Sequence, residues 1–332
     1  MTREVPDLDL GAIATVNTDS GQIISDGQPI AVRIATIEQV AAPKILVLVV
    51  GSLTARNVTI TGANAVAVVS NGDVQIMGSF AAPANGLTPG AGAFNDGTCK
   101  GAAGATLLPD RSVNGGSGGG GFGGRGGGGG LAGSGTFTAT GGAGGAPTGN
   151  PGLVPLRGGC AGGGFAALGL PNGGGGGGAI QIVSRTRILV TGAVAANGSS
   201  GTAGGSGGGI LLEAPAVDVP GVVVANGGGG GNACGLLGIV PGENGRLDGT
   251  PAAGSTGPCS DGSPSAARGG NGAAGSFGPG SGQDGPTPIS AGAFGGHGGG
   301  GVGRIRVNTV PGGLHVTGIF SPTPTTGELE SR

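Results

Sequence analysis

Five short segments of the chain repeat one pattern of apolar positions that ends in glycine. In each segment two apolar residues are separated by one residue, and a glycine follows two positions after the second of them. The copies are Val58–Gly62, Val74–Gly78, Ile188–Gly192, Val217–Gly221 and Leu314–Gly318. Alternation with a period of two is typical of β-strands, and a closing glycine is typical of a turn. The pattern predicts five strands that each end at a turn glycine.

A second apolar strand precedes at least four of these copies. The four are Ala63–Ser70, Ala179–Val183, Ile210–Leu212 and Arg304–Val307. Each unit is then a strand, a corner, a second strand and a turn. Such units cannot bury their apolar faces alone, so copies must stack, and stacked short strands form a parallel solenoid. We predict an all-β fold with a parallel β-helix as its spine.

Two of the units are close duplicates, at residues 179–198 and 210–227. Both follow a Gly-Gly pair, and both end in Ala-Asn-Gly, at Ala196–Gly198 and Ala225–Gly227. Asn-Gly favours left-handed backbone conformations, which suit a tight exit from a coil. If the five closing glycines, Gly62, Gly78, Gly192, Gly221 and Gly318, adopt positive φ, replacing any of them by valine should destabilise the chain.

Glycine dominates the segments between the units, about residues 84–178, 197–209 and 227–301. The chain has 88 glycines and 22 prolines among 332 residues, a composition often found in disordered proteins. Only 10% of residues are charged, however, the net charge is −2, and the mean hydropathy is positive, which favours order. We expect polyproline II helices that pack at backbone distance as a polyglycine II bundle.

The predicted domain organisation follows from these segments. Residues 33–320 form one domain, residues 1–32 cap the helix or contact another subunit, and residues 321–332 are a polar tail. The first residues do not resemble a secretory signal, because Asp7 and Asp9 precede any apolar run, so a leader was removed or export uses another route. Ile45–Val50 is too short to span a membrane. The balanced charge provides no basic stripe for nucleic acid.

The four cysteines predict disulfides. Two lie in the first glycine-rich segment and two in the last, namely Cys99, Cys160, Cys234 and Cys259. Two local bridges are the simplest of three connectivities, and each would contribute roughly 3–4 kcal/mol. Paired cysteines indicate an oxidising compartment. No Cys-x-x-Cys spacing exists and His297 and His315 are isolated, so we predict no metal site and no cofactor.

Several phrases of the sequence resemble known proteins. They are residues 149–159, 177–184, 208–215 and 301–307. These phrases resemble glycine-rich secreted and surface proteins common in myxobacteria, over about residues 40–310. The resemblance implies export and a cell-envelope or matrix setting. In composition the chain also resembles, more loosely, the polyglycine sandwich of phage tail-fibre adhesins and glycine-rich insect antifreeze proteins.

Catalysis is not predicted, although many parallel β-helices cleave polysaccharides with paired carboxylates. The acidic candidates are Asp73, Glu213, Asp218, Asp248 and Asp261. Asp218 alternates with valines and should face solvent, whereas Glu213 should accept backbone N–H bonds at a corner. Neither histidine suggests a catalytic triad. The chain has no Trp and no Tyr for stacking on sugars, and its Gly-x-Gly-x-x-Gly matches open no helix.

Three functional classes remain open. The favoured one is a non-enzymatic, extracellular structural or adhesive surface protein whose end loops recognise a cell-surface or matrix component. The candidate loops are Phe94–Lys100, Leu236–Arg246 and Phe277–Phe294. The second class is a filament that grows head to tail through open sheet edges. The third is ice binding, which the irregular positions of Thr59, Thr61, Thr186, Thr191 and Thr317 do not favour.

Overall fold

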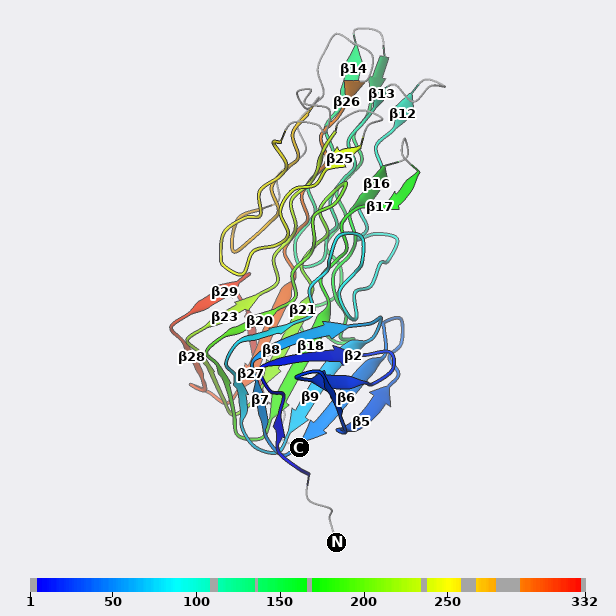
Figure 1. The fold of residues 1–332 in the computed structure, drawn as a ribbon. Coiled ribbons are helices and arrows are strands. Elements are labelled where there is room, and N and C mark those ends of the chain that lie inside the picture. The colour runs from blue at the N-terminus through cyan, green and yellow to red at the C-terminus, as the bar shows by residue number, and fades with distance from the viewer. Residues whose placement is uncertain are drawn as a thin grey trace.

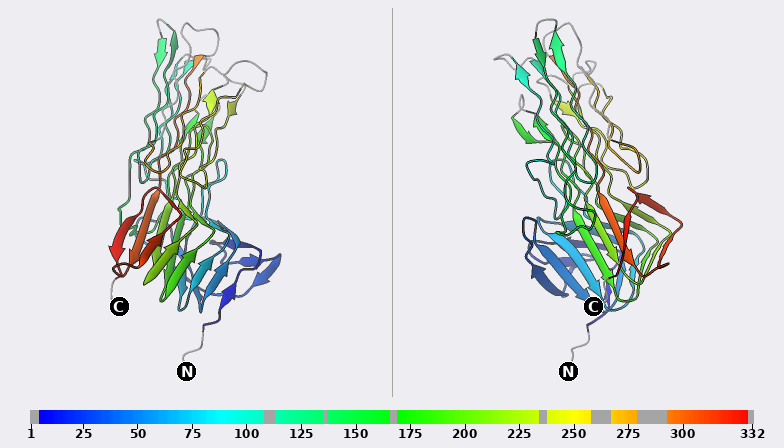
Figure 2. Two further views of the ribbon diagram at one scale, coloured as in Figure 1. Left: turned by 90° about the vertical axis from the view of Figure 1, so that its left-hand side faces the viewer. Right: turned by 180° about the vertical axis from the view of Figure 1, so that it is seen from behind.

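The structure is a computed structural model that describes residues 5–107, 113–134, 137–165, 169–233, 238–257, 267–278 and 293–329. This part of the chain is all-β and contains no helix. It has two regions, a base of three mostly parallel sheets and a long bundle that rises from one side of the base (Figure 1). The views in Figure 2 show the bundle leaving the base in a single direction.

Three sheets, which we name A, B and C, form the base. Sheet A contains β1 (Leu8–Asp9), β7 (Leu53–Ala55), β10 (Val74–Ile76), β19 (Arg187–Val190), β22 (Ala216–Val219) and β28 (Leu314–Val316). Sheet B contains β4 (Gln28–Ile30), β3 (Ile23–Ser25), β2 (Ile13–Asn17), β8 (Asn57–Thr61), β11 (Ser79–Ala81), β20 (Ala193–Ala195), β23 (Val222–Val224) and β29 (Ile319–Ser321). Sheet C contains β5 (Arg33–Ile37), β6 (Ile45–Val50), β9 (Ala65–Ser70), β18 (Ala179–Ser184), β21 (Gly209–Glu213), β27 (Arg304–Thr309) and β30 (Thr325–Glu328).

Within the described ranges, the chain passes through sheets C, A and B in turn five times. Each visit adds one parallel strand to each sheet, starting with β6, β7 and β8 and ending with β27, β28 and β29. Four of the five glycine-ended segments stack in register in sheet A, because Val74 pairs with Ile188, Ile188 with Val217, and Val217 with Leu314. The fifth segment, at Val58, lies in sheet B instead, as β8.

In four of the five repeats the sequence pattern did not predict the third strand. The third strand, in sheet B, follows the closing glycine directly at β11, β20, β23 and β29. These strands have only three residues each, such as Ala193–Ala195, so they are too short to display a clear alternation. The repeating unit is therefore three strands rather than two.

Apolar side chains from all three sheets share one core. Val217 and Val219 in β22 are fully buried, and so are Ile188 and Val190 in β19 and Phe80 in β11. Asp218 lies between the two valines and points outward, as the alternation predicts. The buried positions recur at every second residue, which gives each short strand one apolar face against the core.

The glycine-rich segments are all inserted at one corner, between sheet B and sheet C. They occupy residues 82–178, 196–208 and 225–303, after β11, β20 and β23 respectively. The preceding visit turns this corner with only three residues, which begin at Gly62. Because successive visits stack, the three insertions leave the base side by side and form the bundle (Figure 1).

Where the structure describes the bundle, its strands are all short. They are β12 (Thr106–Leu107), β13 (Val113–Asn114), β14 (Ala132–Ser134), β15 (Phe137–Ala139), β16 (Gly163–Phe165), β17 (Leu170–Asn172), β24 (Asn232–Ala233), β25 (Ile239–Val240) and β26 (Ala293–Phe294). Between them the glycine runs extend without forming ladder pairs. The bundle is thus ordered by a different kind of hydrogen bonding from that of the base.

Hydrogen bonds in the bundle follow a period of three residues. Four successive N–H groups donate to three different neighbouring runs, from Gly118 to Ala102, Gly119 to Gly127, Gly120 to Gly204 and Gly121 to Cys99. The first and the fourth donor reach the same neighbouring run. In the last insertion, residues 295, 298 and 301 donate to residues 114, 117 and 120, while residues 297, 300 and 303 donate to residues 231, 228 and 225.

The two ends of the base differ. At the start of the chain, β2 pairs with β8, and an antiparallel hairpin of β3 and β4 extends sheet B, while β5 pairs antiparallel with β6. At the other end, the tail adds β30 to β27 in parallel. Residues 8–30 thus pair with their own chain, and part of the tail belongs to sheet C.

Candidate functional site

The centre of the bundle has room for backbone and for no side chain. A Cβ at Gly204 would overlap the carbonyl oxygen of Gly228 and approach the Gly300 nitrogen to 2.7 Å. These three glycines come from three different runs, in the second and third insertions. A Cβ at Gly205 would likewise overlap the Gly175 carbonyl oxygen of the first insertion. Glycine is required at these positions because all three insertions meet at backbone distance.

The closing glycines of sheet A are required because a side chain would overlap neighbouring backbone, and not because of a positive φ. Only Gly62 has a positive φ, of 107°. A Cβ at Gly192, Gly221 or Gly318 would overlap the carbonyl oxygen of the glycine stacked one repeat earlier, and a Cβ at Gly78 would lie 2.6 Å from the Arg56 carbonyl oxygen. The stacking of corners, not a left-handed conformation, excludes larger residues at these four positions.

The two Ala-Asn-Gly segments also differ from their predicted role. Neither Gly198 nor Gly227 has a positive φ. Both lie at the start of an insertion and not in a tight turn between two strands. The Asn197 side chain accepts a hydrogen bond from the Asn226 N–H at 2.8 Å, and each amide nitrogen donates to carbonyls in residues 245–248. The stacked asparagines therefore fasten a bundle loop to the base.

A disulfide between Cys99 and Cys160 closes the first insertion, as predicted for this pair. Both cysteines are fully buried. Cys234 and Cys259 lie outside the described residues. The bridge joins two runs that are 61 residues apart in the sequence. It therefore links the beginning of the first insertion to its later part.

Of the predicted recognition loops, Phe94–Lys100 forms a polar cluster around Asp96. The Asp96 carboxylate accepts hydrogen bonds from Thr98, the Cys99 N–H and Thr148, and it pairs with Arg157 at 3.1 Å. Partial burial raises the pKa of Asp96, but the hydrogen bonds from Thr98, Thr148 and the Cys99 N–H outweigh it and lower the pKa to about 2. The cluster is internally satisfied and fixes the loop.

The other two predicted loops are described only in part. In Leu236–Arg246, Asn244 accepts the Ser200 N–H, and Glu243 forms an ion pair with Arg246 at 2.6 Å. In Phe277–Phe294, the described residues are 277, 278, 293 and 294. Phe277 is 61% exposed, which is unusual for a phenylalanine and makes it a candidate contact residue.

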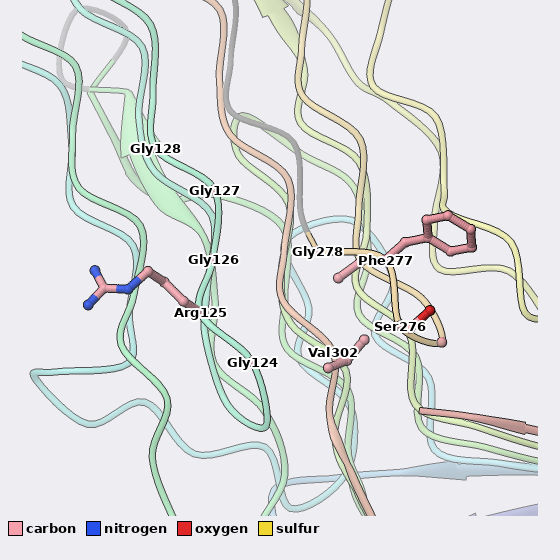
Figure 3. Close-up of a pocket in the computed structure, with 11 residues that line it drawn as sticks. Gly124, Arg125, Gly126, Gly127, Gly128, Ser276, Phe277, Gly278 and Val302 are labelled. Carbon is pink, nitrogen blue, oxygen red and sulfur yellow. The ribbon is translucent and has the colours of Figure 1, made fainter. Parts of the chain in front are cut away.

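A surface groove of about 450 Å³ lies beside Phe277 (Figure 3). One wall is the backbone of residues 124–128, and the other wall is the hairpin of residues 273–278, with Val302 at the base. Figure 3 shows the Arg125 side chain pointing away from Val302 and Phe277. The groove thus presents glycine backbone, apolar side chains and the Ser276 hydroxyl, and Arg125, the one charged residue of its lining, points away from Val302. Such a lining suits an uncharged ligand.

His297 occupies the interior of the bundle. Its Nδ1 accepts the Ser117 N–H at 2.9 Å, so the side chain replaces a backbone carbonyl as acceptor. Its Nε2 is buried without a hydrogen-bond partner, and Phe165 packs edge-on against the ring. Burial disfavours the charged imidazolium and lowers the pKa of His297 to about 4. No pattern in the sequence indicates that this isolated histidine is buried.

The acidic residues considered for catalysis are separated and individually bonded. Asp73 accepts a hydrogen bond from Thr186, Asp248 from Thr250, and Glu213 from the side chains of Gln181 and Asn308 rather than from backbone N–H groups. Asp218 pairs with Arg187 at 2.5 Å and His315 at 3.1 Å on the outer face of sheet A. Asp261 lies outside the described residues. No two of the four described carboxyl groups face each other in a recorded contact.

Other chemistry is sparse in the described part of the chain. It contains no group of three His, Cys, Asp or Glu residues that could hold a metal ion. Within the same residues, no helix is long and apolar enough to cross a membrane. The threonines do not form an unbroken row: Thr191 and Thr317 occupy equivalent corner positions, but Pro220 lies between them.

Comparison with protein-family models, with curated proteins and with solved structures finds no match for this chain. Evidence for the function therefore comes from the geometry of the molecule itself.

Proposed function

We propose that the protein is an exported, non-enzymatic structural or adhesive surface protein. The base is a parallel β-helix, and the bundle is a polyglycine II assembly built from insertions at one corner of the helix. The three-residue period of hydrogen-bond partners in the bundle carries this proposal, because polyproline II helices have three residues per turn. Each run then bonds to neighbours on three sides.

Such a bundle is suited to mechanical and positional roles. In the described residues, its interior consists of backbone groups that hydrogen-bond to one another, so it presents few side chains for chemistry and little unpaired backbone for proteases. The buried Cys99–Cys160 disulfide supports an oxidising, extracellular setting. The bundle would hold its surface side chains at a fixed distance from the base.

Recognition would then use the few exposed apolar side chains on the bundle. Phe277 beside the groove is the best candidate, because it is 61% exposed and next to a cavity that could accept an uncharged group. An envelope polymer or a surface protein with an apolar or backbone-like segment fits this lining.

The test is cosedimentation of the labelled, full-length protein with purified bacterial envelope fractions. We expect saturable binding that falls at least about tenfold in Phe277→Ser, equivalent to 1.4 kcal/mol. The matched control, Gln75→Ser, changes an exposed residue on β10 in the base and should bind like the wild type. Absence of binding by the wild type, or release of reducing sugars from the same fractions, would overturn the proposal.

A further inference from the structure

Strand β5 is the most accessible edge of the three sheets. Six strands terminate sheets A, B and C in the described residues, and β5 is the longest, with five residues against two to four in the others. All five of its residues are exposed, and it pairs only with β6. Its outer edge therefore presents unpaired backbone groups that can accept another strand.

The sequence of β5 has none of the usual edge-protecting features apart from Arg33. The terminal strand β4 contains Pro29, and β30 contains Gly327 and Glu328. In β5, by contrast, two isoleucines, an alanine and a threonine follow Arg33. Ile34 is 44% exposed and Ile37 is 51% exposed, so both faces of the edge carry apolar surface.

Apolar surface continues beyond the end of β5. Gln39 binds the turn after β5 to another loop, because its side chain accepts the Leu156 N–H at 2.7 Å and donates to the Leu156 carbonyl at 2.8 Å. Val40 and Val154, which flank this contact in the sequence, are 91% and 72% exposed. The edge and the neighbouring loops thus offer both backbone pairing and apolar contact.

We propose that two copies of this chain form a closed, twofold dimer by antiparallel pairing of their β5 strands. In the register centred on Ala35, Arg33 faces the partner's Ile37, Ile34 faces the partner's Thr36, and the two Ala35 residues face each other. Each pair joins residues on the same face, and like charges do not face each other. Beyond the strand end, Glu38 pairs with Lys44 of its own chain at 2.7 Å, so the paired strands leave no unpaired carboxylate beside the partner's strand.

A second copy of the chain fits this edge better than continued head-to-tail stacking does. Beyond the five repeats, the two ends together carry one extra strand in sheet A, three in sheet B and two in sheet C. Two molecules stacked end to end could not pair all three sheets at once with such unequal overhangs. Pairing through β5 uses only sheet C, and it leaves no further β5 edge for growth.

The pairing also fixes the shape of the dimer. Strand β5 runs toward the bundle, whereas β6 runs away from it (Figure 1). A twofold axis perpendicular to sheet C reverses the direction of the partner's strands. The two bundles would therefore project in roughly opposite directions from a joined base.

Sedimentation of the full-length protein over a range of concentrations tests the dimer. Ala35→Arg places two like charges opposite each other at the twofold axis, and it should raise the dimer dissociation constant at least about tenfold. Ala35 is exposed, so the variant should fold, which a melting curve checks. Gln75→Arg adds the same charge to an exposed site on β10 and should leave the dissociation constant unchanged.

Electron microscopy of the same samples gives a second readout. We expect particles with two bundles that point in opposite directions for the wild type and for Gln75→Arg, and single bundles for Ala35→Arg. A wild type that stays monomeric, filaments of unlimited length, or dimers that Ala35→Arg does not weaken would each overturn the proposal.

Discussion

The interior of the base is filled by side chains, whereas the interior of the bundle is filled by backbone. In the base, side chains such as Phe80, Ile188 and Val217 fill the space between sheets, and every one of them is fully buried. In the bundle, the space between runs is so small that a single Cβ at Gly204 would overlap a neighbouring carbonyl. Removing atoms should therefore damage the base, whereas adding atoms should damage the bundle.

The largest expected effect is the loss of a large side chain from the base. Phe80→Ala should lower the free energy of unfolding by about 3–5 kcal/mol, because it leaves a cavity in the shared core. The same truncation in the bundle, Phe277→Ala, removes a side chain that is 61% exposed and should change stability by less than about 1 kcal/mol. Chemical denaturation of both variants measures the contrast. Equal losses would contradict it.

The second prediction concerns the covalent link within the bundle. Replacing both Cys99 and Cys160 by serine should cost about 2–4 kcal/mol, since the bridge restricts a loop of 61 residues in the unfolded chain. Limited proteolysis should then cut first within residues 82–178, while the strands of the base stay protected. Cleavage that begins in the base would show that the insertion does not depend on the bridge.

The third prediction adds an atom where the bundle has no room. Gly204→Ala should destabilise the bundle by about 3 kcal/mol, the upper end of the range for overpacking, because its Cβ meets backbone from two other runs. Gly278→Ala is the matched control, since a Cβ there meets nothing within 4 Å. Thermal melting compares the two variants. A Gly204→Ala protein as stable as the control would mean that the runs can move apart.

The smallest expected effect is a pH dependence that arises in the bundle. The pKa of His297 is lowered to about 4 by burial, so the unfolded chain binds a proton near pH 6.5 while the folded chain stays neutral. Stability should therefore be complete above about pH 6.5 and fall by roughly 2–3 kcal/mol as the pH drops to about 4. His297→Gln keeps an acceptor for the Ser117 N–H and should remove this dependence.

A second acid transition belongs to a different pH window. The lowered pKa of Asp96 contributes stability that is present above about pH 4 and is lost as the pH falls toward 2. Urea denaturation at several pH values separates the two groups, because His297→Gln should leave the lower transition intact. Loss of both transitions in that variant would contradict the assignment.

The sequence predicted much of the base and less of the bundle. The alternation in Val74–Gly78, Ile188–Gly192, Val217–Gly221 and Leu314–Gly318 was sufficient to locate the strands of sheet A, because a period of two reports which residues face the core. The same pattern at Val58 belongs to sheet B, since a local pattern does not say which sheet a strand joins. Short strands such as Ala193–Ala195 were missed because three residues cannot show a period.

The candidate contact residues were harder to predict. The groove beside Phe277 forms where residues 124–128 of the first insertion lie near Val302 of the third. No sequence pattern predicts that these segments are neighbours. The pairing of Cys99 with Cys160 was the simplest prediction, and the structure agrees with it. Asp96 and Arg157, which hold the same loop, are 61 residues apart and carried no local signal.

The sequence by itself determined that the chain is all-β and that glycine must be packed against backbone, because side-chain size and alternation are local properties. Only the tertiary structure decided where that packing occurs. Stacking of the repeats placed three insertions at one corner, and it set the glycines of residues 78, 192, 221 and 318 one above another. The requirement for glycine there comes from atoms far away in the chain, so it depends on the register between repeats rather than on the residue's own φ.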